Sequence, residues 1–419
     1  MKKEKYHLKI NKEMNSEETK QKYIDAIDSA KIMNNTKKAE FSFNQHFVGN
    51  PFFEVVGNTD DKFDVKFYDG DKLIHSSSLG CNMWTKLSRK YFTEWVTKVY
   101  KNGDIVYDEK LNLNNRRVYI TMESKSIGDS IAWVPYLEEF RKKHNCIVIA
   151  STFWNKLFKE SYKNIEFVEP GTTVNNLYAM YSVGYFYNMD MEPELPNTLP
   201  LQKTVTNILG LEYKEIKPTI DFIPKDNTHK SKYVTIAPHS TAGLKYWNNE
   251  TGWQEVVDFL IEDGYSVINV SREGCDIKGV TSIYDFSMEN IMDTIYHSEF
   301  FIGLSSGLSW VAWSLGKHVV MISNFTNSDH EFSLNCTRIT NTSVCNGCWN
   351  NSNFKFDKGD WNWCPIYKGT PRQFECHKEI TGEMVINGIV KIKNYKTNVS
   401  LNNIKNKIIN DKGKKLTIK

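Results

Sequence analysis

The chain has 419 residues and a mass of 48.7 kDa, a length that corresponds to two or three domains with buried cores. Its 40% hydrophobic and 25% charged residues, with a mean hydropathy of −0.50, exclude disordered, fibrous and small disulfide-stapled proteins. The formal net charge of +3 reflects 53 basic and 50 acidic residues, so charge alone favours no class of partner.

The first 40 residues are polar and carry a weak helical pattern of apolar residues, which predicts a helical lead-in. The initial segment MKKEKYHLKINKEMNSEETKQKY is charged throughout and has no apolar run of the signal-peptide type. Nowhere do eighteen apolar residues follow one another. These features predict a cytosolic protein that does not span a membrane.

Residues 41–115 alternate apolar and polar side chains in short runs separated by Gly, Asn and Asp, which predicts a small antiparallel sheet. Together with the lead-in, they form a predicted first domain over residues 1–115. The triplet Asp69-Gly70-Asp71 inside this region matches an Asp-x-Asp metal motif of glycosyltransferases. Asp-Gly between two alternating runs is typical of a hairpin turn, and we interpret the triplet as a turn.

From Arg116 the pattern changes to strands alternating with helices. The strands RRVYITM, CIVIAS and IEFVEP alternate with helices predicted over DSIAWVPYLEEFRKK and NKLFKESY. After a Pro-marked linker at 215–224, further strands are YVTIAP, SVINVS, FFIGL and KHVVMIS, and further helices are TGWQEVVDFLIEDG, MENIMDTIYHS and LSWVAWSLG. No P-loop and no Gly-x-Gly-x-x-Gly sequence is present, which disfavours NTPases and dehydrogenases.

This alternation predicts an α/β protein with parallel sheets covered by helices on both faces. We expect one Rossmann-like domain over 116–215 and a second over 216–393, facing each other across a cleft. Ligands would then lie beyond the carboxyl ends of the strands. The tail 394–419 has seven Lys and one acidic residue and is predicted to be a solvated or helical extension.

Asp129 lies in the turn Ser126-Ile127-Gly128-Asp129-Ser130, between the first strand of the predicted domain and its helix. A carboxylate at this position overlooks the predicted cleft and could take a proton from an incoming hydroxyl. Asp is also a favoured N-cap residue, and from the local pattern alone capping is the commoner role. Both interpretations stay open at this point.

Two further turns carry the residue types that bind phosphate. After YVTIAP come Ser240, Thr241 and Lys245, which supply hydroxyl donors and one cation for a diphosphate. After FFIGL, the sequence Ser305-Ser306-Gly307 opens a helix, whose free N–H groups and dipole favour an anion. The alternative interpretations are an ordinary solvated loop and a simple serine cap.

Arg272 and Glu273 follow the strand SVINVS and would face the same cleft. There the Arg could hold a phosphate and the Glu a ribose hydroxyl. A surface ion pair is the commoner role of such residues.

Four of the eight cysteines, Cys345, Cys348, Cys364 and Cys376, fall in one window of 32 residues, where about 0.6 are expected by chance. Disulfides are rare in the cytosol, so the cluster predicts a metal site. Four thiolates suit Zn or Fe and leave no open coordination position, so we expect a structural metal knuckle.

Taken together, these stretches resemble the bacterial autotransporter heptosyltransferases. The resemblance covers roughly residues 41–386 and is carried by the Ile-Gly-Asp-Ser turn, by HSTAGLKYWN, by GLSSGLSW and most specifically by CNGCWN…WNWCPIYKGTPRQFEC. It implies a GT-B fold of two Rossmann-like domains. It also implies an inverting, ADP-heptose-dependent enzyme that modifies serines of adhesin repeats, an iron-binding four-cysteine site, and a homo-oligomeric, dodecamer-like ring.

Carried over by position, the resemblance makes Asp129 the general base and gives Lys245, Ser240 and Thr241 to the diphosphate. The turn at Ser305 becomes the second phosphate-binding turn. Related lipopolysaccharide heptosyltransferases have Asp-Thr-Gly there and a His three residues later, where this chain has Ser-Ser-Gly and Trp310. This departure argues against a lipopolysaccharide acceptor.

Two alternative functions fit the sequence less well. A lipopolysaccharide-type glycosyltransferase needs a basic or amphipathic surface that faces the membrane, and the N-terminal half of the sequence does not show one. A metal-stapled nucleic-acid-binding protein needs a basic stripe among aromatics. The basic residues of the cysteine segment are few and partly offset by acids, so no nucleic-acid partner is expected.

Overall fold

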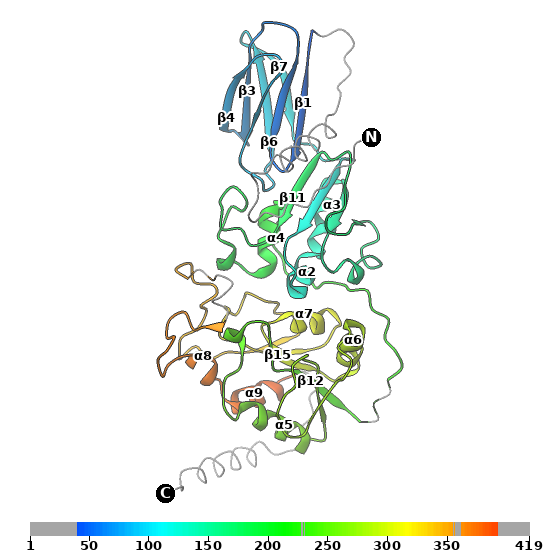
Figure 1. Cartoon of the computed structure of the whole chain (residues 1–419), viewed down its shortest axis with the longest axis vertical. Coiled ribbons are helices and arrows are strands. Elements are labelled where there is room, and N and C mark those ends of the chain that lie inside the picture. The colour runs from blue at the N-terminus through cyan, green and yellow to red at the C-terminus, as the bar shows by residue number, and fades with distance from the viewer. Residues whose placement is uncertain (1–39, 228, 230, 355, 357–361, 393–419) are drawn as a thin grey trace. The chain divides into compact units, whose positions relative to one another are not determined.

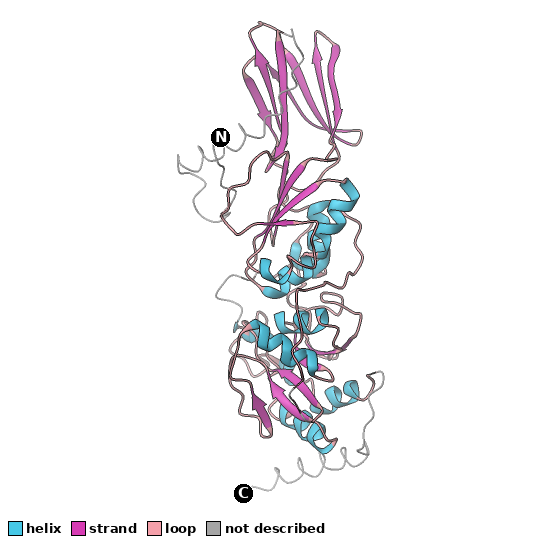
Figure 2. Ribbon diagram, turned by 90° about the vertical axis from the view of Figure 1, so that its right-hand side faces the viewer, coloured by secondary structure: helices cyan, strands magenta, loops and turns pink. Residues whose placement is uncertain are grey.

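The computed structural model describes residues 40–227, 229, 231–354, 356 and 362–392 (Figure 1). The predicted lead-in before Glu40 and the Lys-rich tail lie outside these residues. Helices and strands alternate over much of the described chain (Figure 2). Within this described part, no helix is long and apolar enough to cross a membrane.

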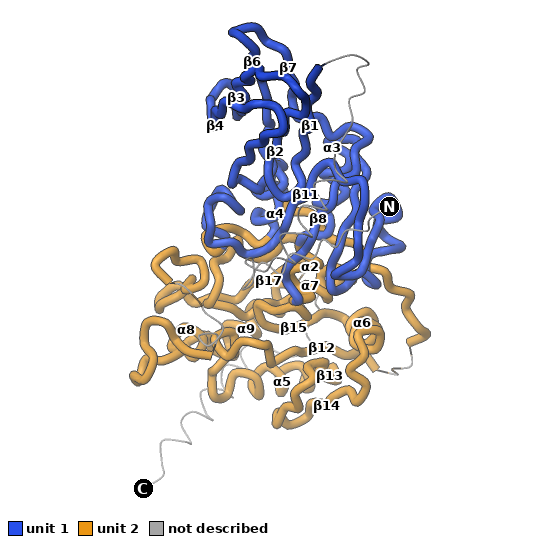
Figure 3. The backbone as a smooth tube through the Cα atoms, turned by 45° about the horizontal axis from the view of Figure 1, so that its top comes forward, with its two compact units in different colours: residues 1–125, 133–196, 202–214 blue, residues 126–132, 197–201, 215–419 orange. Residues whose placement is uncertain are grey.

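Contacts divide the chain into two compact units, which are coloured separately in Figure 3. Unit 1 comprises residues 1–125, 133–196 and 202–214, and unit 2 comprises residues 126–132, 197–201 and 215–419. The short segment 126–132, which contains Asp129, therefore groups with the later half of the chain. The predicted domain boundaries at 115 and 215 stay predictions.

One sheet of unit 1 combines parallel and antiparallel strands in the order β10-β9-β8-β11-β1-β2-β5. Strands β10, β9, β8, β11 and β1 pair in parallel. Strand β2 pairs antiparallel with β1, and β5 pairs antiparallel with β2. The strands are β1 (Phe41–Val48), β2 (Phe52–Gly57), β5 (Met83–Lys86), β8 (Arg117–Met122), β9 (Ile147–Ser151), β10 (Glu166–Phe167) and β11 (Ala179–Val183). The first strand of the β-rich region thus extends the parallel sheet.

A second, antiparallel sheet of unit 1 has the order β4-β3-β6-β7. Its strands are β3 (Phe63–Asp69), β4 (Lys72–Leu79), β6 (Trp95–Lys101) and β7 (Asp104–Lys110). Asp69 pairs with Lys72 across the β3–β4 hairpin, and Gly70 has φ +58°. The hairpin interpretation of Asp69-Gly70-Asp71 is confirmed. The prediction of one small sheet was wrong, because the β-rich region is shared between two sheets.

The helices of the first α/β segment differ from the prediction in two places. Pro135, which has no N–H to continue a helix, divides the predicted single helix into α2 (Ile127–Trp133) and α3 (Pro135–His144). The predicted helix NKLFKESY is wrong, since only the 3₁₀ turn η1 (Asn155–Leu157) forms. Its Asn155 instead bonds to the Thr152 N–H at 2.9 Å and the Val168 carbonyl at 2.8 Å. Two further elements precede the linker: η2 (Pro196–Thr198) and α4 (Leu201–Leu209).

The sheet of unit 2 is parallel throughout, in the order β14-β13-β12-β15-β16-β17. Its strands are β12 (Tyr233–Ala237), β13 (Ser266–Asn269), β14 (Val280–Ser282), β15 (Phe301–Leu304), β16 (Val319–Ile322) and β17 (Cys336–Ile339). The helices are η3 (Gly243–Lys245), α5 (Gly252–Glu262), α6 (Met288–His297), α7 (Gly307–Ser314), α8 (Glu375–Lys378) and α9 (Gly382–Ile389). In chain order this is the 3-2-1-4-5-6 arrangement of a Rossmann sheet.

The core of unit 2 lies between this sheet and the helices α5 and α9. Apolar side chains of β12 and β15, such as Ile236 and Ile302, pack with Val257 of α5 and Ile386 of α9, and all are at most 2% exposed. Strands buried on both faces explain the continuous apolar runs in the sequence. This rigid core fixes the carboxyl ends of the strands, where the candidate site lies.

Candidate active site

The order in which the chain adds strands to the unit 2 sheet reverses between β12 and β15. These two strands are neighbours in the sheet although two other strands separate them in the sequence. In open α/β sheets, ligands bind beyond the carboxyl ends of the strands at such a switch point. The loop after β12 holds Ser240, Thr241 and Lys245, and the loop after β15 holds Ser305 and Ser306. The topology therefore places both predicted phosphate-binding loops at the same end of the sheet.

Ser240 shapes the loop after β12. Its hydroxyl donates to the carbonyl of Ala242 at 2.8 Å and accepts the Ala242 N–H at 3.2 Å. The chain then forms η3, where the Gly243 N–H donates to Asn362 Oδ1 at 3.0 Å. Thr241, next to Ser240, is exposed. Ser240 thus folds the loop, while Thr241 keeps its side chain open to a ligand.

Lys245 ends η3 and is half-buried. Burial lowers the pKa of Lys245, whereas the negative charges of Glu331 and Asp129 act in the opposite direction. The Lys245 ammonium therefore lies within electrostatic reach of the predicted general base. An ammonium in a half-buried loop is suited to neutralise the charge of a diphosphate leaving group.

The turn after β15 leads into α7. Ser306 occupies the N-cap position with an extended backbone, and within the described structure its side chain makes no capping hydrogen bond to the helix. The buried Ser309 hydroxyl donates to the Leu304 carbonyl at 2.5 Å and so ties the first turn of α7 to β15. The N–H groups at the start of α7 are consequently directed toward the end of the strand, where an anion is favoured.

Asp129 is brought to this turn by a close approach of two glycines. A Cβ built on Gly307 would lie 2.6 Å from Ile127 Cγ2, and one built on Gly128 would lie 3.2 Å from Gly307 Cα. Larger residues at either position would push the first turns of α2 and α7 apart. Since Asp129 follows Gly128 directly, its carboxylate belongs to the same end of unit 2 as Lys245 and the α7 N-terminus.

Asp129 is the third residue of α2, so it lies in the first helical turn and not at the N-cap. The capping interpretation was therefore wrong in its placement of the helix start. An acidic residue in the first turn is still favoured by the helix dipole. That structural benefit is compatible with a chemical role for the same carboxylate.

Arg272 and Glu273 lie in an exposed loop after β13, the neighbour of β12. Asn269 holds this loop by donating to the carbonyls of Ser271 and Glu273, at 3.4 and 3.2 Å, and by accepting the Ser271 N–H at 2.9 Å. The loop therefore starts at the same end of the sheet as the two predicted phosphate-binding loops. Among the described residues, no contact joins the Arg272 or Glu273 side chain to those loops.

The cysteine segment packs beside these loops. Cys348, Cys364 and Cys376 are buried and Cys345 is partly buried, and the Tyr367 N–H lies 3.2 Å from Cys364 Sγ. Burial raises the pKa of Cys348 to about 12, and the neighbouring Cys345 and Cys364 add to the shift. The thiols thus lie close enough to influence one another. Within the described residues, however, no group of three or more His, Cys, Asp or Glu side chains is arranged to hold a metal.

The Glycosyltransferase family 9 (heptosyltransferase) profile matches residues 198–360. The autotransporter heptosyltransferase Aah of Escherichia coli is 36% identical over 332 residues, which cover 75% of this chain and 84% of Aah. The chain belongs to the autotransporter heptosyltransferase family. It is accordingly a glycosyltransferase, and the family's reaction is heptose transfer.

Two solved structures of another family member, TibC from enterotoxigenic E. coli H10407, share the fold of this heptosyltransferase. The first, of an iron-containing dodecameric enzyme, has a TM-score of 0.77 and 29% identity, covering 87% of this chain and 98% of TibC. The second holds ADP-D-beta-D-heptose and has a TM-score of 0.75 at 29% identity, over 86% of this chain and 99% of TibC.

The family also contains a member described as inactive. BimC of Burkholderia thailandensis, an inactive autotransporter heptosyltransferase, is 28% identical over 330 residues, covering 75% of this chain and 78% of BimC. Overall similarity within the family therefore does not assign the catalytic residues. Their assignment in this heptosyltransferase has to be argued from the site itself.

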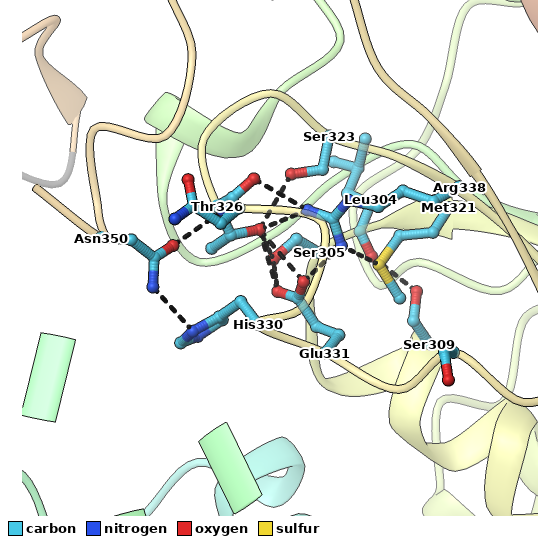
Figure 4. Close-up of polar contacts among 12 residues, drawn as sticks. Leu304, Ser305, Ser309, Met321, Ser323, Thr326, His330, Glu331, Arg338 and Asn350 are labelled. Atoms are coloured by element: carbon cyan, nitrogen blue, oxygen red, sulfur yellow. Dashed lines mark hydrogen bonds and ion pairs between the residues drawn. The ribbon is translucent and has the colours of Figure 1, made fainter. Parts of the chain in front are cut away.

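One part of the site was missed by sequence reasoning. Glu331 and Arg338 form a buried ion pair at 2.5 Å beside Ser305, and Thr326 bonds to both (Figure 4). The loop NFTNSDHE after β16 has no periodicity and no motif that could have revealed this cluster. The only sequence signal was a carboxylate followed seven positions later by a basic residue, which lies within the short strand β17.

Proposed function

We propose that this heptosyltransferase moves heptose from ADP-heptose to serine hydroxyls of an autotransporter adhesin, with inversion at the anomeric carbon. The observation that carries the proposal is the close packing of Gly128 on Gly307, which keeps Asp129 beside the N-terminus of α7. The TibC complex with ADP-heptose supports the donor, and the names of the relatives support an autotransporter acceptor.

In the proposed reaction, Asp129 accepts the proton of the serine hydroxyl as the serine oxygen forms a bond to the anomeric carbon. The bond from that carbon to the diphosphate oxygen breaks, and its electron pair leaves with ADP. Lys245 and the N–H groups at the start of α7 stabilise the charge that develops on the diphosphate. Ser240 and Thr241 complete the diphosphate loop, while Arg272 and Glu273 are assigned to the nucleoside side.

The Asp129 assignment predicts a separation of binding from chemistry. Asp129→Ala should lower heptose transfer by about 10²–10⁴-fold, because the hydroxyl loses its base. Calorimetry with ADP should show unchanged affinity, since the diphosphate is held by other residues. Asp258→Ala, which removes an exposed carboxylate of α5, serves as the matched control and should retain full turnover. Full turnover by Asp129→Ala would refute the assignment.

For the cysteines we propose a structural iron or zinc site formed by Cys345, Cys348, Cys364 and Cys376. Mutual effects of the thiols on their pKa values support it, as does the Tyr367 N–H directed at Cys364 Sγ. The iron content of TibC favours iron. Bound there, the metal would cross-link the loops of the segment and would supply no step of the transfer.

We propose two further properties, an oligomeric state and a cellular compartment. The dodecameric state of TibC supports a ring-like homo-oligomer for this chain as well. We also propose that the protein acts in the cytoplasm, where nucleotide-activated sugars are made and where thiols remain reduced.

A further inference from the structure

Ser305 begins the turn that leads into α7, yet its hydroxyl is directed into the protein. The residue is 2% exposed, and its Oγ donates a short hydrogen bond to Glu331 Oε1 (Figure 4). A serine hydroxyl has one proton to donate. Because that proton is donated to Glu331, the Ser305 hydroxyl is not available to donate a hydrogen bond to a phosphate.

Glu331 comes from the loop between β16 and β17 and is fully engaged by protein groups. Arg338 Nη1 lies 2.5 Å from its Oε2, and Thr326 Oγ1 lies 3.1 Å from each of its oxygens. The side chains of Glu331 and Arg338 are only 3% and 11% exposed. Burying such a pair costs free energy that its hydrogen bonds offset, and here the offset is incomplete, because Arg338 Nε has no hydrogen-bond partner among the described residues. The pair therefore fixes the position of the Glu331 carboxylate and lowers the free energy of unfolding.

The opposite side of this loop is fixed by the cysteine segment. The Gly347 N–H donates to the Asn324 carbonyl at 2.8 Å, and the Trp349 N–H donates to the Phe325 carbonyl at 3.0 Å. Asn324 Nδ2 in turn donates to the Cys376 carbonyl at 2.8 Å. The loop that carries Glu331 is thus held by Arg338 on one side and by the cysteine segment on the other.

Glu331 also acts on Lys245. Its negative charge opposes the effect of burial on the Lys245 pKa, together with Asp129, while the neighbouring His330 lies close enough to be affected by both charges. Burial opposes ionisation of Glu331, but the charges of Arg338 and His330 and the hydrogen bonds from Ser305 and Arg338 together outweigh it and lower the pKa of Glu331 to about 2. Glu331 is therefore a permanent anion at physiological pH.

We propose that Glu331, locked by Arg338 and Thr326, is a positioning residue for the donor diphosphate, because its contact with Ser305 fixes the turn that leads into α7. This inference rests on the proposed function, since it assumes that the turn and Lys245 bind the diphosphate of the donor. It assigns Ser305 to the support of the turn and leaves direct contact with phosphate to Ser306 and the α7 N–H groups.

A double-mutant cycle tests this assignment, with ADP as the probe and calorimetry on the full chain. Ser305→Ala and Glu331→Gln should each weaken ADP binding by about tenfold, the size expected for a lost hydrogen bond to a charged group. The double variant should bind ADP no more weakly than Glu331→Gln alone, since both changes break one interaction. If Glu331→Gln does not fold, Thr326→Val replaces it in the cycle.

A control separates positioning from stability. Val257→Ala makes a cavity in the core between α5 and the sheet, and should lower the unfolding temperature while leaving ADP affinity unchanged. Additive losses in the cycle would show that Ser305 contacts the phosphate directly and would overturn the proposal, as would unchanged ADP affinity in both single variants. A wild-type protein that binds no ADP would overturn the proposed function itself.

Discussion

At the scale of single residues, Glu192 is a buried carboxyl group that the proposed mechanism does not use. It is 0% exposed, and its Oε1 has no hydrogen-bond partner among the described residues, while the Phe186 N–H lies 3.5 Å from Oε2. Burial raises the pKa of Glu192 to about 9, and the charge of Glu194 adds to the shift. Glu192 is therefore neutral in the folded protein at neutral pH.

This shift predicts that Glu192→Gln becomes progressively more stabilising as the pH rises. In the unfolded chain Glu192 ionises near its ordinary value of 4.5, whereas the folded protein keeps its proton until about pH 9. Unfolding therefore releases a proton between these values, and wild-type stability falls by at most about 1.4 kcal/mol per pH unit. Unfolding temperatures at pH 5 and pH 8 should diverge between wild type and Glu192→Gln.

The exposed Glu212, changed to Gln, is the control and should show no such divergence. A constant difference between wild type and Glu192→Gln at both pH values would show that the group is ionised in the folded protein.

The sequence was informative about site residues wherever a motif follows a strand. Lys245 and the Ser305 turn follow β12 and β15, neighbouring strands of one parallel sheet, whose carboxyl ends therefore lie together, whereas Asp129 follows β8 of the other sheet. The side-chain partners could not be predicted this way. Glu331 reaches Ser305 across 26 residues of chain, and such long-range pairings depend on packing that no local pattern encodes.

At the scale of elements, the cysteine segment connects the two halves of the candidate site. Asn362, between Cys348 and Cys364, accepts the N–H of Gly243 in the Lys245 loop, and Gly347 holds the loop of Glu331. Gly347, between Cys345 and Cys348, has φ +67°, a conformation that favours glycine. The segment is therefore placed to support both loops without taking part in the reaction.

If these cysteines bind a metal, elemental analysis of the purified protein should find about one Fe or Zn per chain. Cys364→Ser should lose the metal because one of four ligands is gone. Cys336→Ser is the matched control: this thiol lies in β17, outside the segment, and should leave the metal content unchanged. Wild-type protein without Fe or Zn, or equal loss in both variants, would refute the metal site.

Elements with a clear period and a clear boundary were predictable. The strands β8, β9, β12, β13, β15 and β16 and the helices α5, α6 and α7 follow the sequence patterns closely, because apolar spacing and flanking polar turns define them. The helix predicted over residues 155–162 does not form. So short an amphipathic segment is marginally stable as a helix, and Asn155 forms its hydrogen bonds with Thr152 and Val168 instead. The extension of the parallel sheet by β1 was also unpredictable, because strand pairing is a long-range choice.

At the scale of the whole molecule, the chain combines an antiparallel sheet, a mixed sheet, a parallel sheet and a cysteine segment in one heptosyltransferase. The residues assigned to chemistry fall in one compact unit, since the segment 126–132 groups with residues 215–419. The proposed base and the proposed diphosphate site are therefore both held by the packing of a single unit.

The most direct measurement is the intact mass of a co-encoded autotransporter adhesin after incubation with this protein and ADP-heptose. The proposed function predicts a mass increase in whole heptose units, located on serine residues by fragmentation. Reactions without ADP-heptose, or with Asp129→Ala, should leave the mass of the adhesin unchanged. An adhesin whose mass does not change with wild-type enzyme and ADP-heptose would contradict the account.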